Sequence, residues 1–445
     1  MLIGIILCFI LGYMAIVFEH PLKLDKTVPA LIMGAIIWAL ISLGHMPVVG
    51  SDHAVGEIDS VLLHHIGKVA EILFFLIGAM TIVELIDMHK GFAVITNRIK
   101  TTSKIRMLWL ICILAFFLSA TLDNLASTIV LVSLLRRLVP DRTERLWFVS
   151  LAVIAANAGG AWSPIGDVTT TMLWIGKKVS TLGLITKLVI PSVVCMLIPL
   201  FFASRMKAFK GNITAAHQTD EEDAEASERL LSSKTMLFVG IGALVFVPIF
   251  KSVTHLPPYV GMMLSLGIVW LVSEYIHPEE DFTEEKRHHY SAHNALSRIE
   301  LSSILFFLGI LVAVAGLESV AVMHDGHQMG LLMSLAETLK SAIPNQDIVI
   351  IVLGFLSAIV DNVPLVAASL GMYTEPMDDS LWHFIAYSAG TGGSMLIIGS
   401  AAGVAAMGME KIDFIWYLKN IAWLAMAGFL GGCLTFIVLE NLLFS

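Results

Sequence analysis

Two short polar elements stand out because each holds an aspartate and an asparagine inside a long apolar stretch. Both read Ser-Ala-x-x-Asp-Asn, and they end at Asp123-Asn124 and at Asp361-Asn362. A carboxylate at membrane depth costs roughly 2.5–3.5 kcal/mol on insertion scales, so two such acids call for a function. Carboxylate and amide oxygens are the ligands that a hard cation such as Na⁺ prefers. The elements therefore predict paired Na⁺ sites at Asp123 and Asp361.

Each Asp-Asn element is followed by a helix that the sequence interrupts. The segment 157–171 holds a glycine pair and a proline, and the segment 388–400 holds another glycine pair. Glycine and proline in the middle of a span release backbone groups that lipid cannot satisfy. Such breaks are tolerated where they line a cavity, and the freed carbonyl groups can bind a cation. We expect broken helices near 157–166 and near 388–399.

A carboxylate in an oxygen-only shell also suits exchange, because a proton and a cation can compete for it. Structural alternatives stay open for several of these residues. Ser119 and Ser357 could bond back to a helical carbonyl group, and the glycine pairs could serve close helix packing. Asp167 could cap the second half-helix, with Thr170 completing the turn. A purely structural acid is less favoured at the two tips, since no basic residue lies nearby in sequence.

The composition sets the class of protein that must position these groups. The chain has 445 residues, of which 57% are hydrophobic and 14% are charged, and its mean hydropathy is +0.84. Soluble domains carry about 25% charged residues, so this is an integral membrane protein. The alternating pattern of a membrane barrel is missing, and an all-α polytopic protein is expected. The net charge of −9 comes with no basic face, which argues against nucleic acid.

Ten spans and two re-entrant hairpins account for the apolar segments. The hairpins are 105–135 and 347–373, each long enough for two short half-crossings around an Asp-Asn tip. Basic residues flank the first hairpin on both sides and place its ends in the cytoplasm. The flanks of the second are mainly acidic or neutral, with Lys340 as the only Lys or Arg, and predict entry from outside. The spans are expected at roughly 1–18, 28–45, 68–88, 146–176, 181–204, 235–252, 258–276, 300–322, 382–409 and 412–441.

The loops are assigned by the same rule. The loops 205–233 and 277–298 are expected in the cytoplasm, and 46–66, which has no Lys or Arg, is expected outside. The histidines His64 and His65 then fall in a surface loop. Both termini are predicted to be external.

Landmarks recur along the chain at a nearly constant shift. The run Ile72 to Leu76 recurs 232 residues later, the Asp-Asn tips differ by 238, and the glycine pairs by 233. Ile37-Trp38 also recurs, as Val269-Trp270, 232 residues later. Four landmarks in one order at nearly one offset predict an internal repeat. The two repeats are 1–204 and 234–445, joined by the acidic linker 205–233. The loop charges give them opposite orientations, as in the inverted-topology repeats of many transporters.

The two Asp-Asn elements and the segment 157–171 resemble those of the NhaD-type sodium/proton antiporters of the ion-transporter superfamily. The resemblance covers nearly the whole chain. It implies the elevator-type fold, in which a transport domain that bears the hairpins moves against a scaffold and which is usually dimeric in the carboxylate branch. It also implies a bacterial inner-membrane protein that exchanges Na⁺ or Li⁺ for H⁺ without a cofactor.

The resemblance extends functional roles to individual residues that match the motif. The second tip departs from the first, because Ile359-Val360 replaces Thr121-Leu122 and leaves it poorer in hydroxyl groups. From its position alone, Glu84 is the acid near a span end that best suits a proton path, with interfacial solvation as an equal alternative, and Glu318 mirrors it in the second half. The candidate cation- and proton-binding residues are Ser119, Asp123, Asn124, Asn157, Asp167, Thr169, Thr170, Ser357, Asp361, Asn362, Thr391 and Ser394.

Two other functions compete with cation exchange. One is a carboxylate or other anion carrier of the same superfamily. Two tip carboxylates would repel its anionic substrate, and the resemblance associates such carriers with Ser-Asn-Thr tips. A membrane enzyme would want a nucleophile or a metal set, and the sequence has neither His-Glu-x-x-His nor Gly-x-Ser-x-Gly. We therefore expect a secondary transporter and no enzyme activity.

Overall fold

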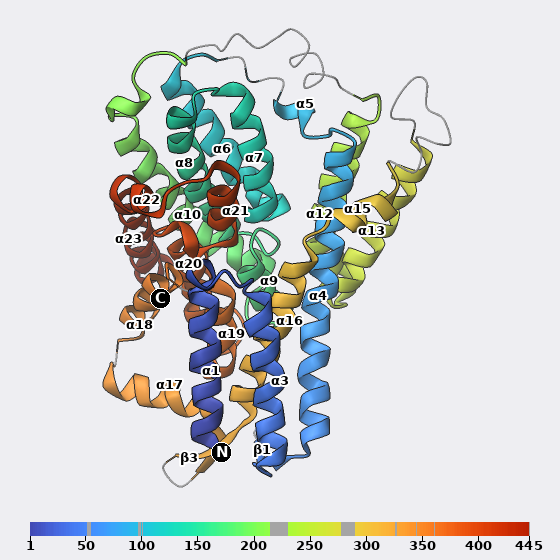
Figure 1. The fold of residues 1–445 in the computed structure, drawn as a ribbon, viewed down its shortest axis with the longest axis vertical. Coiled ribbons are helices and arrows are strands. Elements are labelled where there is room, and N and C mark those ends of the chain that lie inside the picture. The colour runs from blue at the N-terminus through green and yellow to red at the C-terminus, as the bar shows by residue number, and fades with distance from the viewer. Residues whose placement is uncertain are drawn as a thin grey trace.

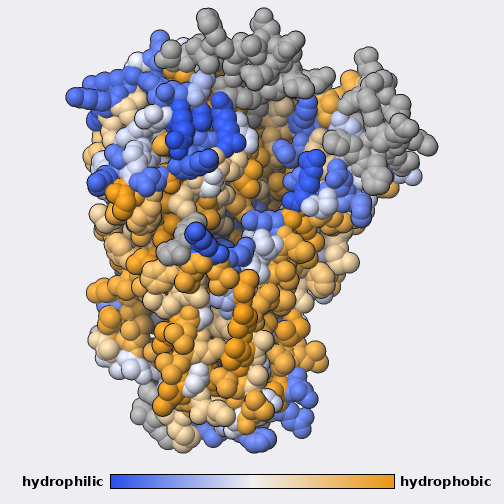
Figure 2. Space-filling view, in the orientation of Figure 1, coloured by the Kyte–Doolittle hydropathy of each residue, from blue (hydrophilic) through white to orange (hydrophobic). Residues whose placement is uncertain are grey.

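The computed structural model describes residues 1–50, 55–96, 99, 101–213, 230–276, 290–324, 327–343, 345–359 and 361–444. These residues are mostly helical. Six of the helices among them are long and apolar enough to cross a membrane, namely α4, α6, α10, α12, α16 and α23. The chain is therefore a polytopic membrane protein, and hydrophobic surface covers much of the face seen in Figure 2.

One set of helices, which we call the first helix group, packs around α16. Within it α3 and α4 pack on α16, α1 packs on α3, and α12 and α13 pack on α4 and on each other. Figure 1 shows α1, α3 and α4 side by side. The group comprises α1 (Leu2–Val17), α3 (Thr27–Leu43), α4 (Ile58–Met88), α12 (Ser233–Thr254), α13 (Pro258–Tyr275), α15 (Ala292–Arg298) and α16 (Leu301–Ser319).

The second helix group holds both Asp-Asn elements and both broken helices. Its main packing pairs are α10 with α23, α6 with α8, α18 with α20, and α7 with α21. It comprises α6 (Lys104–Leu122), α7 (Asn124–Leu138), α8 (Arg142–Gly160), α9 (Val168–Ile175), α10 (Thr181–Ala203), α18 (Gln346–Ser357), α19 (Asn362–Met372), α20 (Ser380–Gly392), α21 (Ala401–Glu410), α22 (Phe414–Asn420) and α23 (Ala422–Leu439). Each group thus combines helices from both parts of the sequence.

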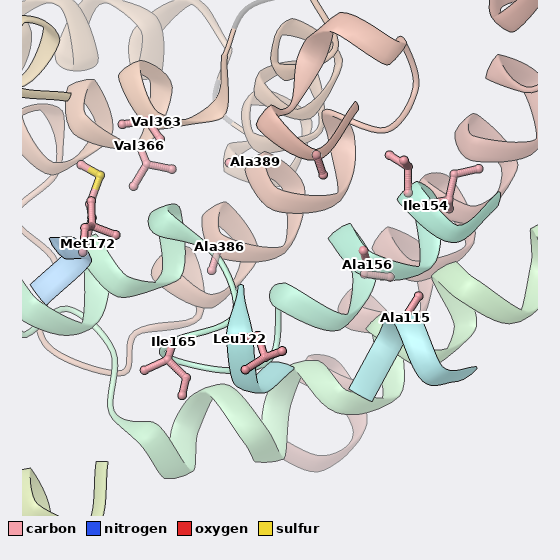
Figure 3. Close-up of a cluster of buried hydrophobic side chains, with 14 of the residues drawn as sticks. Ala115, Leu122, Ile154, Ala156, Ile165, Met172, Val363, Val366, Ala386 and Ala389 are labelled. Atoms are coloured by element: carbon pink, nitrogen blue, oxygen red, sulfur yellow. The ribbon is translucent and has the colours of Figure 1, made fainter. Parts of the chain in front are cut away.

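Small side chains let the second group pack tightly around its breaks. Figure 3 shows Ala115, Ala156, Ala386 and Ala389 among its buried apolar residues, with Val363 and Val366 of α19 near Met172 of α9. All of these side chains are at most 5% exposed. Alanine keeps the backbones close, as polar contacts between helices require.

The two breaks are built alike from glycine. A Cβ on Gly159 would clash with the carbonyl group of Phe116, and a Cβ on Gly392 would clash with that of Gly354. The second glycine of each pair contacts the backbone at the far end of its own break, Gly166 in the first and Gly399 in the second. No side chain fits at these approaches, so glycine is required there.

Several boundaries differ from the sequence-based expectation. The helix α4 begins at Ile58 rather than near 68, because the apolar run continues, so His64 and His65 lie in a helix and not in a surface loop. The last expected span is divided at Ile421, between α22 and α23. In the expected hairpin 105–135, where two half-crossings were predicted, the helix α6 alone is long enough to cross a membrane. The other expected spans correspond to shorter or divided helices, so the count of ten stays a prediction.

Short strands accompany the helices of this mostly helical chain. Two antiparallel pairs lie at one end of the molecule (Figure 1): β1 (Val48–Val49) with β2 (Val55–Gly56), and β3 (Ala321–His324) with β4 (His327–Gly330). The Ala321 amide donates to the Pro47 carbonyl oxygen at 3.0 Å. The strands satisfy the backbone where the chain leaves its helices.

The remaining elements lie in connections. They are α2 (Glu19–Leu22), α5 (Ala93–Thr96), α17 (Leu331–Ala342), the 3₁₀ turns Lys207–Phe209 and Ile397–Gly399, and the π-turn Glu440–Phe444. Residues 214–229 of the acidic linker and residues 277–289 of the loop 277–298 fall outside the described residues.

Candidate cation site

A cavity of about 470 Å³ lies between the two helix groups. The first group contributes Lys26, Glu84 and Asp87 to its lining, and the second contributes both Asp-Asn tips. The acidic side chains of the lining are Glu84, Asp87, Asp123, Asp167, Glu300 and Asp361, against the basic Lys26, Lys90 and Arg298. Six acids against three bases make an electronegative cavity, which attracts cations.

The first tip is a sharp break at Asp123, between α6 and α7. Asp123 has φ 86° and ψ 162°, a backbone conformation normally left to glycine, so α6 cannot continue through it. Its carboxylate Oδ1 then accepts from the Ala126 amide at 2.7 Å and caps α7. A strained aspartate that also faces the cavity is typical of a functional position.

The second tip places the same residue types differently. Asp361 has the ordinary values φ −49° and ψ 136°, and its Oδ1 accepts from the Val363 amide at 3.3 Å. Its Oδ2 accepts from the Lys26 ammonium at 2.9 Å, across 335 residues of sequence. The two tip carboxylates therefore differ, because in the described chain Asp361 is ion-paired by Lys26, which lies between the expected spans 1–18 and 28–45.

Asp167 joins the two tips. Its Oδ1 accepts from the Asn124 amide nitrogen at 3.3 Å, and its Oδ2 accepts from Asn362 at 3.0 Å and from the Thr169 hydroxyl at 2.6 Å. Asp167 is buried, with 3% of its surface exposed. Asp167 occupies the N-cap position of α9, but its side chain makes no cap hydrogen bond. Capping therefore does not account for this carboxylate, and Thr170 closes the turn by donating to its carbonyl oxygen at 2.9 Å.

Asn157 extends the network to the second broken helix. Its Oδ1 accepts from Asn124 at 3.0 Å, and its Nδ2 donates to the hydroxyl oxygens of Ser394 and Ser400, both at 2.9 Å. Ser400 was missed among the candidates. It lies 233 residues after Asp167, the shift of the glycine pairs, and that signal could have identified it.

Four of the candidate hydroxyl groups bond to backbone instead. Ser119 donates to the Gly166 carbonyl at 3.5 Å, Ser357 to Ala389 at 2.7 Å, and Thr391 to Tyr387 at 2.6 Å. Thr170, described above, is the fourth, and none of the four lines the cavity. The two serines bond across to neighbouring segments rather than back to their own helix. Their geometry fits a role in holding the breaks together.

The two acids proposed for a proton path are separated. Glu84 lines the cavity, and Arg298 donates to its Oε1 at 3.4 Å. Glu318 is not in the lining of this cavity. Within the described residues, no group of three or more His, Cys, Asp or Glu side chains could hold a metal ion. A bound Na⁺ would therefore take amide, hydroxyl or carbonyl oxygens beside its carboxylate.

The chain is similar to known membrane transporters. A family model described as "Citrate transporter" (CitMHS) matches residues 13–383. The chain is 44% identical to Sodium/proton antiporter 1 of Arabidopsis thaliana over 99% of this chain and 73% of the relative. It is 43% identical to Sodium/proton antiporter 2 of the same plant over 98% and 99%. It is also 30% identical to the Na⁺/H⁺ antiporter NhaD of Vibrio cholerae, over 93% and 87% of the two chains.

Proposed function

Because the chain belongs to the CitMHS citrate-transporter family and, within it, to the Na⁺/H⁺ antiporters of the NhaD type, we propose that it exchanges Na⁺ for H⁺ at the cavity between its two helix groups. Li⁺ is the second cation that we expect it to carry. The observation that carries this proposal is Asp167, whose buried carboxylate accepts from the asparagines of both tips.

Exchange at this site requires that cation and proton exclude each other. Asp123, Asp167 and Asp361 line one cavity, where each carboxylate can hold either ion. Na⁺ would bind to the deprotonated carboxylates and complete its shell with the tip amides. Protonation would remove the charge that holds it. Glu84, at the same cavity, is placed to relay the proton.

The fold we propose around the site is an inverted repeat that works as an elevator. Two features support the repeat: the matched glycine approaches at the two breaks and the near-constant shift of the landmarks. The elevator is supported by the cavity, which separates the group bearing both tips from the group around α16. Movement of the second helix group against the first would carry the bound ion across the membrane.

A homodimer and a bacterial inner membrane with external termini complete the proposal. The N-terminus lies at the end that carries β1 and β3 (Figure 1), the end expected outside. The bacterial location stays a prediction, since the chain is 44% identical to a plant antiporter and 30% identical to a bacterial one.

Transport of a carboxylate is the second candidate, because the matching family model is described as a citrate transporter. The charge of the cavity argues against it. Six acidic side chains face three basic ones, and an anion would meet repulsion from both tips.

Proton flux in everted membrane vesicles separates the two functions. Vesicles holding a preformed ΔpH are challenged with NaCl, LiCl, KCl, sodium-free succinate or sodium-free citrate, with choline chloride as the ionic-strength control. We expect NaCl and LiCl to dissipate ΔpH and succinate and citrate to leave it intact. Dissipation by an organic anion without any response to Na⁺ would reverse the assignment.

A further inference from the structure

Lys26 connects the first helix group to the second tip. It lies in the connection after α2, at the N-cap position of α3, and its Nζ lies 2.9 Å from Asp361 Oδ2. The same Nζ lies 4.5 Å from the centroid of the Phe306 ring of α16. The ion pair therefore spans the interface between the group around α16 and the group that bears the tips.

Both partners remain within reach of an ion from solution. Lys26 and Asp361 line the cavity, and their side chains are 22% and 12% exposed. The ammonium is a compact point charge on a flexible stem, so it can leave the carboxylate without moving α3. A mostly buried ion pair is weak evidence for stability, because desolvation offsets its attraction, and this leaves the place of the pair at the tip unexplained by folding alone.

The three site carboxylates differ in their partners. In the part of the chain that the structure describes, Asp361 is the one ion-paired by a basic side chain, whereas Asp167 receives amide and hydroxyl donors and Asp123 receives a backbone amide. A monovalent ammonium on Asp361 Oδ2 occupies a position that a monovalent metal ion would need.

Resting on the proposed function, we propose that Lys26 is a resident counter-cation that Na⁺ must displace from Asp361. In the ion-free state the ammonium neutralises the second tip and ties it to the first helix group. An arriving Na⁺ takes the carboxylate, and the ion pair between the two groups opens. Binding of the transported ion is thereby coupled to release of the group that carries it.

Competition of this kind is measured by the Na⁺ concentration that half-saturates the purified full chain, read from Na⁺-dependent stabilisation of its Tm. Each variant is referred to its own Na⁺-free Tm, so a loss of stability does not obscure the result. Lys26→Met should lower the half-saturating Na⁺ concentration several-fold, because the competitor is gone. Lys26→Arg keeps a cation and should stay at or above the wild-type value.

Lys104→Met is the matched control. Lys104 forms a half-buried ion pair with Glu144, with 2.6 Å between Nζ and Oε1, and neither residue lines the cavity. It should leave the half-saturating concentration unchanged. In an Asp361→Asn background, Lys26→Met should lose its effect, since the carboxylate for which the two cations compete is absent.

An unchanged or raised half-saturating concentration in Lys26→Met, or an equal fall in Lys104→Met, would overturn the inference. The wild-type vesicle assay separates this outcome from failure of the proposed function. Na⁺/H⁺ exchange by the wild type together with an unaltered Lys26→Met affinity rejects only the role of Lys26. Absence of both Na⁺-dependent flux and Na⁺-dependent stabilisation in the wild type rejects the antiporter itself.

Discussion

Three aspartates at the cavity hold their carboxylates in three different ways. Asp123 caps α7 from a strained backbone, Asp167 accepts from three side chains, and Asp361 pairs with Lys26. The same residue type therefore has three local environments. We therefore expect substitutions of the three aspartates to differ in their effects on exchange activity and on stability.

We expect Asp123→Asn and Asp361→Asn to lower the Na⁺/H⁺ exchange rate by about tenfold or more, because a charged ligand contributes about 1.5–3 kcal/mol. Asparagine has the shape of aspartate and adds no atoms to the strained backbone at Asp123, so both variants should stay folded in the membrane. Asp167→Asn should also lower Tm, because its new amide group would face donors from Asn124, Asn362 or Thr169. Exchange in vesicles and Tm in detergent check these results; wild-type rates in either tip variant would count against the site.

The buried histidine His89, just after the end of α4, leads to a second prediction, which concerns the pH dependence of stability. His89 is fully buried, and its ring nitrogens lie 2.8 Å from the Ser232 hydroxyl oxygen and 3.1 Å from that of Ser273. Burial lowers the pKa of His89 from 6.5 to about 4. The neutral form is thus favoured by folding, and the resulting stability is complete above the unfolded pKa.

That stability is lost as pH falls from 6.5 towards 4, because the unfolded chain takes up a proton that the folded chain refuses. The loss from this group should reach about 2 kcal/mol by about pH 5. His89→Gln does not titrate, so its Tm should fall less between about pH 7.5 and about pH 5 than that of the wild type. Parallel Tm profiles for the two proteins would contradict this role.

At the scale of elements, the breaks depend on close backbone contact between helices. Gly159 of α8 lies against the α6 carbonyl of Phe116, and Gly392 of α20 lies against the α18 carbonyl of Gly354. The helix that precedes each tip is thereby held against the helix that precedes each break. This contact positions Asn157 beside Asn124.

Alanine at either glycine should therefore disrupt the site through packing. We expect Gly159→Ala and Gly392→Ala each to cost about 1–3 kcal/mol and to reduce exchange, because the added methyl group meets backbone that cannot move aside. Gly267→Ala in α13 is the control, since a Cβ there meets nothing within 4 Å. It should raise stability by about 0.5–1 kcal/mol. Similar Tm changes in all three variants would show that the contacts are not limiting.

At the scale of the whole molecule, an ion cluster joins the early and late parts of the second helix group. Glu410 at the end of α21 is 1% exposed, and its carboxylate accepts from Arg136 at 2.6 Å and from Arg145 at 2.8 Å. Arg142 donates to the carbonyl oxygen of Glu410 at 3.1 Å. Helices more than 260 residues apart are thus held at one end of the group.

Glu410→Gln should destabilise the protein by about 3 kcal/mol, because it leaves two guanidinium groups without their buried counter-charge. Lys187→Met breaks the pair with Glu440, whose side chain is 24% exposed against 1% for Glu410, and should cost about 1 kcal/mol. Denaturation in detergent measures both. A Glu410→Gln loss as small as that of Lys187→Met would show that the cluster does not hold the group together.

What the sequence determined by itself rests on local chemistry. Hydropathy identified the membrane class, the glycine pairs marked both breaks, and the Asp-Asn elements marked both cavity-lining tips, because span length and backbone freedom are read within a few residues. The β pairs escaped, since strand pairing depends on neighbours from elsewhere in the chain. The early start of α4 could have been predicted, because the apolar run continues back to Ile58.

Only the tertiary structure decided which polar groups meet. Asn362 reaches Asp167 across 195 residues, Asn157 reaches Ser400 across 243, and Lys26 reaches Asp361 across 335. No periodicity or spacing encodes such partners, because they follow from how two groups of helices pack. The same packing turned Asp167 from a possible cap into the junction of both tips, and it gave Asp361 a cation that its sequence neighbours lack.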